Sequence, residues 1–176
     1  MKQLKEYAIQ FVGLKIGRHQ YEYHIKDEFF KHFEYEDFNS VDVKVNVELE
    51  KKATLLELNF KIKGFVNVNC DLTNEPYNQK ISNKFDLVVK FGEEYNDEEI
   101  DILVIPHGEY QVNIQQYIYE LIVLAVPNKL IHPGIKDGTL KSDILEKLDE
   151  LSPKEKNDNN KGDETDPRWN TLKKLL

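Results

Sequence analysis

The sequence is poor in cysteine and contains no long hydrophobic run. Cys70 is the only cysteine among 176 residues, so no disulfide can form within the chain, which suits a reducing cytoplasm. The N-terminus lacks the apolar segment of a signal peptide. The longest apolar run, residues 121–126, is far shorter than the ~20 residues that span a bilayer. These absences predict a soluble, cytoplasmic protein that does not enter a membrane.

Motifs of common enzymes are missing as well. The eight glycines are scattered and form no phosphate-binding loop, and neither a Gly-x-Ser-x-Gly nor a His-Glu-x-x-His motif is present. The histidines do not have the spacing of metal ligands, and His24 is predicted to face solvent from a strand. We therefore expect a protein that is not an enzyme and that has neither catalytic residues nor a cofactor.

The charge of the chain is unevenly distributed. Its 24 basic and 32 acidic side chains give a net charge of −8. Residues 1–92 contain 14 of each sign, so the whole excess lies in residues 93–176, which contain 10 basic and 18 acidic side chains. Modules that bind nucleic acid are usually basic, and any contact with RNA would therefore require a local basic patch.

Apolar and polar residues alternate over much of the chain, which predicts strands with one buried and one exposed face. The clearest strand covers residues 41–50. A second alternation runs from Leu56 through Gly64 to Leu72 and predicts either one curled strand or two strands joined at a kink. A turn at 73–76 leads to a return strand at 81–91. Strands at 7–14 and 21–25 are expected to lie on either side of a turn at Gly17-Arg18, as a pair. Further expected elements are a strand at 102–105, an acidic loop at 92–99, and helices at 27–33, 113–126 and 141–151.

These elements predict an α+β fold, in which a few helices pack against a strongly curved antiparallel β-sheet that either stays open or closes into a barrel. Residues 1–152 form the domain, and residues 153–165 are polar enough to be a disordered linker. Residues 166–176 form a C-terminal helix, capped by Asp166 with Pro167 at its first position, which docks in cis or in trans. The oligomeric state stays open.

Two segments of the sequence resemble a known family. The strand that ends in Cys70-Asp71-Leu72, followed by Pro76, resembles the Cys-x-x-Cys-Leu-x-x-Pro motif of the YceD-like proteins, called large ribosomal RNA subunit accumulation proteins. The sequence Asp166-Pro167-Arg168-Trp169 resembles the Asp-Pro-Arg tail of the same family. An acidic loop, an apolar strand and an apolar helix lie between these segments in the expected order.

The resemblance also has a departure. Many members have four cysteines with the spacing of a zinc ribbon, whereas Thr73 stands at the second position here and residues 132–138 contain no cysteine. One thiol cannot form a structural zinc site. The resemblance therefore implies a metal-free branch of the family, in which Cys70 packs as a small apolar group.

The function that the resemblance implies is non-enzymatic support of the maturation or accumulation of large-subunit ribosomal RNA. The partner would be that RNA, a ribosome assembly intermediate or an assembly protein. Six lysines are predicted to face outward from neighbouring strands, where they would bind phosphates: Lys44, Lys61, Lys63, Lys80, Lys84 and Lys90. The alternative is a mixed solvated surface, because Glu48, Glu57 and Asp86 are interspersed.

A different class of function stays open, namely a small-molecule-binding β-barrel or an enzyme of unrecognised type. A curled sheet encloses a cavity when it closes. Five aromatic residues would then line that cavity, whereas in an open sheet they would pack as ordinary core: Tyr21, Tyr23, Phe60, Phe85 and Phe91. An internal pocket of ~300 Å³ or more with convergent polar groups would favour this class.

Overall fold

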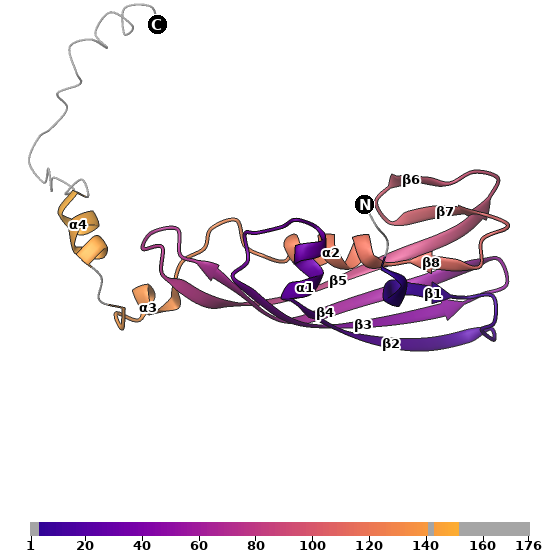
Figure 1. Cartoon of the computed structure of the whole chain (residues 1–176), viewed down its shortest axis with the longest axis horizontal. Helices are drawn as coiled ribbons and strands as arrows, with labels where there is room; N and C mark the ends of the chain where they lie inside the picture. Colours follow the sequence, from indigo (N-terminus) through magenta and orange to yellow (C-terminus); the bar gives the residue numbers. More distant parts are fainter. Residues whose placement is uncertain (1–3, 141–142, 152–176) are drawn as a thin grey trace, which may run out of the picture. The chain divides into compact units, whose positions relative to one another are not determined.

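The computed structural model describes residues 4–140 and 143–151. Its main element is a six-stranded sheet (Figure 1). The strands lie side by side in the order β2 (Gly17–Lys26), β3 (Ser40–Lys51), β4 (Leu55–Asn69), β5 (Pro76–Gly92), β7 (Ile102–Pro106) and β6 (Asn96–Glu99). All neighbours are antiparallel except β5 and β7, which are parallel. The predicted α+β class is confirmed, but the sheet is mixed, and in the described part of the chain it stays open between β2 and β6.

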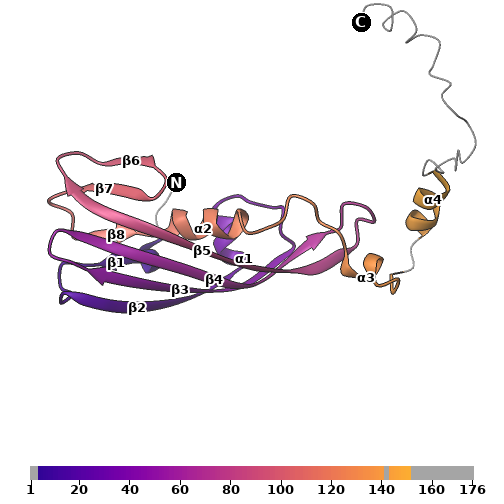
Figure 2. The same cartoon turned by 180° about the vertical axis from the view of Figure 1, so that it is seen from behind.

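A smaller layer covers one face of this sheet. It consists of the short helix η1 (Lys5–Tyr7), the two-stranded sheet of β1 (Ala8–Gln10) and β8 (Gln111–Asn113), and the helices α1 (Asp27–His32) and α2 (Gln115–Val123). Both views show these elements on the same side (Figures 1 and 2). Within residues 4–140, no helix or strand covers the opposite face. α3 (Pro133–Lys136) follows α2 along the chain.

The alternating pattern of the central strands explains this arrangement. In β3, Val43, Val45 and Leu49 are fully buried, while the residues between them face outward. β4 buries Leu58 and Phe60 on the same side of the sheet. Successive side chains of a strand point to opposite faces, so one face of the sheet is apolar and the other is polar. The predicted strands at 41–50 and 81–91 are confirmed.

Gly64 allows β4 to run as one continuous strand beside β3, which is the first of the two predicted alternatives. It lies opposite Val43. A Cβ at this position would overlap the carbonyl oxygen of Asp42 and would lie 2.6 Å from Val43 Cα. Glycine is therefore needed because the two backbones approach so closely.

Other expectations need correction. The predicted strands at 7–14 and 21–25 do not pair with each other: β1 pairs with β8, and β2 pairs with β3. Pairing between distant segments leaves no local sequence pattern, which is why the sequence did not reveal it. The acidic loop contains the edge strand β6. α2 ends at Val123, before Pro127, and Asn113 lies in β8, although its Oδ1 accepts the Gln115 N–H at 2.9 Å.

The C-terminal region is described only as far as Leu151. α4 (Asp143–Leu151) corresponds to the helix predicted at 141–151 and belongs to a second unit of the chain. The predicted linker at 153–165 and the predicted helix at 166–176, with Asp166, Pro167, Arg168 and Trp169, lie outside the described residues. The domain boundary at 152 stays a prediction. Among the described helices, none is long and apolar enough to cross a membrane.

The close approach at Gly64 predicts the effect of a single added methyl group. Gly64→Ala should lower the free energy of unfolding by about 1–3 kcal/mol, because the backbones of β3 and β4 must separate. Urea denaturation would measure the change. Gly108→Ala is the matched control, since a Cβ there meets nothing within 4 Å. Equal stability of the two variants would contradict the assigned role of Gly64.

Candidate functional site

The register of the central strands brings predicted lysines together on the uncovered face of the sheet. Lys44 of β3 lies opposite Lys63 of β4, and Lys61 of β4 lies opposite Lys84 of β5. Lys61 and Lys63 are successive outward positions of one strand, so the two pairs are neighbours. All four side chains are exposed.

Lys80 extends this cluster, whereas Lys90 does not. Lys80 is exposed and lies opposite Phe65, the outward position next to Lys63. Lys90 is also exposed but lies opposite Leu55, at the other end of the ladder. The structure therefore groups five of the six predicted lysines. We call Lys44, Lys61, Lys63, Lys80 and Lys84 the lysine face.

The acidic residues of the same sheet surface lie mainly toward the opposite end and have partners of their own. Arg18 contacts Glu48 and Glu50, with N···O distances of 3.8 and 3.3 Å. Glu57 is paired with Lys52, and Asp86 accepts a hydrogen bond from the Asn59 amide. In the described part of the chain, no residue of the lysine face forms an ion pair. The alternative of a mixed solvated surface therefore stays open, since Asp86 follows Lys84 as the next outward residue of β5.

Besides Asp86, which follows Lys84 on the outward side of β5, two further carboxylates lie near the lysine face. Asp42 is opposite Lys26 on the edge strand, and its Oδ1 is 2.7 Å from His24 Nε2. The hydrogen bond from His24 holds the pKa of the Asp42 carboxyl below its usual value. Glu22 lies on the same edge strand, opposite Asn46. His24 faces outward from the exposed face, as predicted.

Phe65 is a residue of this surface that sequence reasoning missed. Its side chain is 49% exposed, and it lies on the polar side of β4 between Lys63 and Asn67. Its neighbours across the strands are Asp42 and Lys80. The available signal was an aromatic residue at a position where the alternation calls for a polar one.

The turn after β4 holds Cys70 in a polar environment. Cys70 is 2% exposed, and its Sγ accepts the His132 N–H at 3.3 Å. Burial raises the pKa of the thiol, but hydrogen bonds from the Thr73 hydroxyl and from the N–H groups of His132, Thr73 and Leu72 lower it below its usual value overall. Cys70 is buried as predicted, but it acts as a hydrogen-bond acceptor and not only as a small apolar group.

Asp71 fastens the same turn to the segment before α3. Its N–H donates to the Leu130 carbonyl at 2.8 Å, and its Oδ2 accepts the Leu130 N–H at 2.7 Å. Of the other motif residues, Leu72 is 38% exposed, and Pro76 opens β5 opposite Asn69. The motif therefore forms a structural junction between two segments about sixty residues apart.

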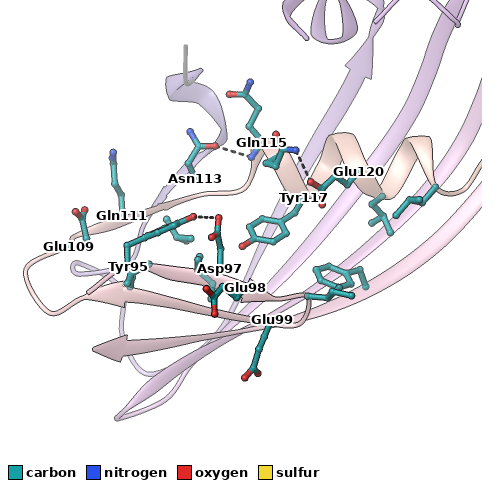
Figure 3. A pocket seen from close by; sticks show the side chains of 18 of the residues that line it. Tyr95, Asp97, Glu98, Glu99, Glu109, Gln111, Asn113, Gln115, Tyr117 and Glu120 are labelled. Carbon is teal, nitrogen blue, oxygen red and sulfur yellow. Dashed lines mark hydrogen bonds between the residues drawn. The ribbon is translucent and has the colours of Figure 1, made fainter. Parts of the chain in front are cut away.

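A pocket of about 750 Å³ lies on the covered side of the sheet, between α2, β8 and the strands β6 and β7 (Figure 3). It is partly open to solvent. Five carboxylates line it, from Asp97, Glu98, Glu99, Glu109 and Glu120. Phe85 is the one residue of the five predicted aromatics in its lining. The pocket exceeds the expected volume, but it lies beside an open sheet and not inside a barrel.

A comparison with models of protein families finds the family to which the chain is similar. Residues 58–176, more than half of its length, match the family model described as "Large ribosomal RNA subunit accumulation protein YceD". The chain belongs to the YceD family. No curated protein and no solved structure was found to match it. The resemblance seen in the sequence is confirmed, and the match includes Cys70, Phe65 and every lysine of the lysine face except Lys44.

The turn that contains Cys70 and Thr73, at the position of the family motif, does not fit a structural zinc ion. Such a site requires four nitrogen or sulfur ligands, and Thr73 occupies the second position. His132 Nδ1 accepts the Gly134 N–H at 3.0 Å. Within residues 4–140 and 143–151, no three His, Cys, Asp or Glu side chains are grouped to hold a metal ion. Hydrogen bonds from the His132 N–H to Cys70 Sγ and between Asp71 and Leu130 join the two segments instead.

Because hydrogen bonds join the two segments of the junction, we expect that folding does not depend on zinc. Addition of EDTA should leave the melting temperature unchanged, because the described junction contains only one thiol. Elemental analysis of the purified protein should give much less than one zinc per chain. Stoichiometric zinc, or unfolding in the chelator, would contradict the assignment to a metal-free branch.

The Asp71 junction can be tested separately. Asp71→Ala should lower the free energy of unfolding by about 1 kcal/mol, since the Leu130 N–H loses its acceptor. Asp71→Asn keeps an acceptor oxygen and should retain most of the stability. Urea denaturation of the three proteins gives the comparison, and equal losses in both variants would show that this hydrogen bond does not stabilise the turn.

Proposed function

We propose that this YceD family member supports the accumulation of large-subunit ribosomal RNA by binding RNA through its lysine face. The family description supports the role in ribosomal RNA accumulation. It names no reaction, and we infer that the protein acts in the cytoplasm as a binding factor and not as an enzyme. The mode of binding is inferred from the exposed face of the sheet.

The observation that carries the proposal is the strand register, which places Lys44 opposite Lys63 and Lys61 opposite Lys84. Like charges directly opposite each other destabilise a sheet, and no described carboxylate forms an ion pair with these residues. A polyanion laid across the strands would meet several ammonium groups at once and release its counterions. Such a binding partner would reduce the repulsion within the two lysine pairs.

Phe65 supports a single-stranded RNA as the ligand. Unpaired bases stack on exposed aromatic side chains, whereas the bases of a duplex are not accessible in this way. Phe65 is exposed beside Lys63 and opposite Lys80. A base on its ring would therefore leave the adjoining phosphates within reach of these ammonium groups.

The test replaces Lys61, Lys63, Lys80 and Lys84 together by Gln and measures binding to a fluorescein-labelled single-stranded fragment of large-subunit ribosomal RNA. We expect affinity to fall at least about tenfold and the slope of log K against log salt to become shallower by about 3, since each phosphate contact in single strands contributes about 0.7. The melting temperature should stay unchanged or rise, because the Lys61–Lys84 repulsion is removed.

The matched control carries the same charge change elsewhere. Lys15, Lys31, Lys129 and Lys136 are exposed and lie outside the lysine face, and their replacement by Gln should have little effect on binding. Phe65→Ala should weaken binding to the single strand about tenfold but not binding to a duplex of the same sequence. Equal losses from the two lysine sets would mean that overall charge, and not the lysine face, attracts RNA.

A further inference from the structure

The pocket on the covered side of the sheet has features that RNA binding does not use. Its walls include Phe85 and Tyr117, whose rings are stacked with centroids 6.1 Å apart. Its lining also contains three strongly exposed apolar side chains: Tyr95 at 59%, Ile100 at 84% and Leu124 at 77%. Exposed apolar groups gathered around a cavity are typical of a surface that binds a partner.

The negative charge of the pocket indicates that the partner's binding group is positively charged. None of its five carboxylates forms an ion pair with any residue in the described ranges. Lys84 is the one lysine or arginine in the lining, and the register assigns its side chain to the opposite face, beside Lys61. A phosphate group would be repelled here, whereas a cationic group would be attracted.

Tyr95, Asp97 and Tyr117 come together at the centre of the pocket. The Tyr95 hydroxyl donates to Asp97 Oδ2 at 3.1 Å, and Figure 3 shows the Tyr117 ring pointing from α2 toward the same carboxylate. Burial, followed by the influence of Tyr95, Asp97 and Glu120, raises the pKa of the Tyr117 hydroxyl. A cation between two aromatic rings and a carboxylate gains both cation–π and ionic attraction.

We propose that this acidic pocket, formed by Phe85, Tyr95, Asp97, Tyr117 and Glu120 with Ile100 and Leu124 at its rim, binds an arginine- or lysine-rich segment of another protein. A cationic side chain enters between Tyr95 and Tyr117, and an apolar residue of the same segment packs on Ile100 or Leu124. The volume of about 750 Å³ accommodates several residues and not only one side chain.

Basic segments of this kind are common in proteins that bind nucleic acid. On the proposed function, the partner is a protein of the same assembly as the RNA, and it binds on the face of the sheet opposite the lysine face; this choice of partner, unlike the cationic chemistry, rests on that function. Lys84 is the one residue that belongs to the lysine face and also lines the pocket. The proposed binding of a basic segment depends on the carboxylates, the aromatic rings and the apolar rim of the pocket, and not on RNA binding by the lysine face.

The experiment measures binding of a fluorescein-labelled peptide, with alternating arginine and glycine around a central leucine, by fluorescence anisotropy at physiological salt. The combined substitution Asp97→Asn and Glu120→Gln should weaken binding about tenfold. The matched control, Glu93→Gln with Glu94→Gln, removes the same charge from exposed residues outside the pocket and should change affinity less than about twofold.

A second pair of variants tests the aromatic wall. Tyr117→Leu should weaken peptide binding about fivefold, while Tyr117→Phe keeps the ring and should bind nearly as well as the unchanged protein. Circular dichroism verifies that each variant is folded. Binding of the ribosomal RNA fragment, measured on the same proteins, should not fall, which separates this proposal from the function of the lysine face.

Three results would overturn the proposal. The first is no measurable binding of the peptide to the unchanged protein. The second is an equal loss from the pocket pair and from the control pair, which would indicate general attraction between opposite charges. The third is a dimer, seen by sedimentation, that the pocket substitutions convert to monomer, because the occupant would then be a second copy of the chain.

Discussion

Burial of one face of the long strands β3, β4 and β5 is the constraint on which the other features depend. Val45, Leu58 and Leu87 are almost completely buried on this face, which is covered by α1, α2 and the β1–β8 sheet. A slip of one residue in any of these strands would turn its apolar side chains to water and its lysines into the core. The core therefore determines that the lysines point outward and that the lysine pairs lie opposite one another.

The same layering places the lysine face and the acidic pocket on opposite sides of the sheet. The lysine face lies on the uncovered side of the sheet, and the carboxylates of the acidic pocket lie beside α2 and β6 on the other. The net charge of −8 is therefore a poor guide to the potential that a ligand meets at either surface. Under the two proposals, a polyanion and a basic segment would bind opposite sides of one sheet and would not compete for the same surface.

The alternation of apolar and polar residues predicted those parts of the fold that depend on residues close together in the sequence. The alternation identified β3, the long β4 and the outward lysines, because a period of two is a property of one strand. It did not reveal the pairing of β1 with β8 or the parallel pairing of β5 with β7. The pocket requires α2, β6 and β8 to meet, and the Cys70–His132 hydrogen bond joins residues 62 positions apart, so neither has a local pattern.

The family motif and the lysine face are connected through the β4–β5 hairpin. The turn that contains Cys70 and Asp71 begins after Asn69 and ends at Pro76, and Asn69 lies opposite Pro76. The length of a turn sets the register of the strands that it joins, so the same turn places Lys84 opposite Lys61 and Lys80 opposite Phe65. A residue inserted in or removed from the turn would change these pairs. Hydrogen bonds with Leu130 and His132 hold the turn in place. Because the turn sets the register of β4 and β5, these hydrogen bonds also maintain the spacing of the charges on the lysine face.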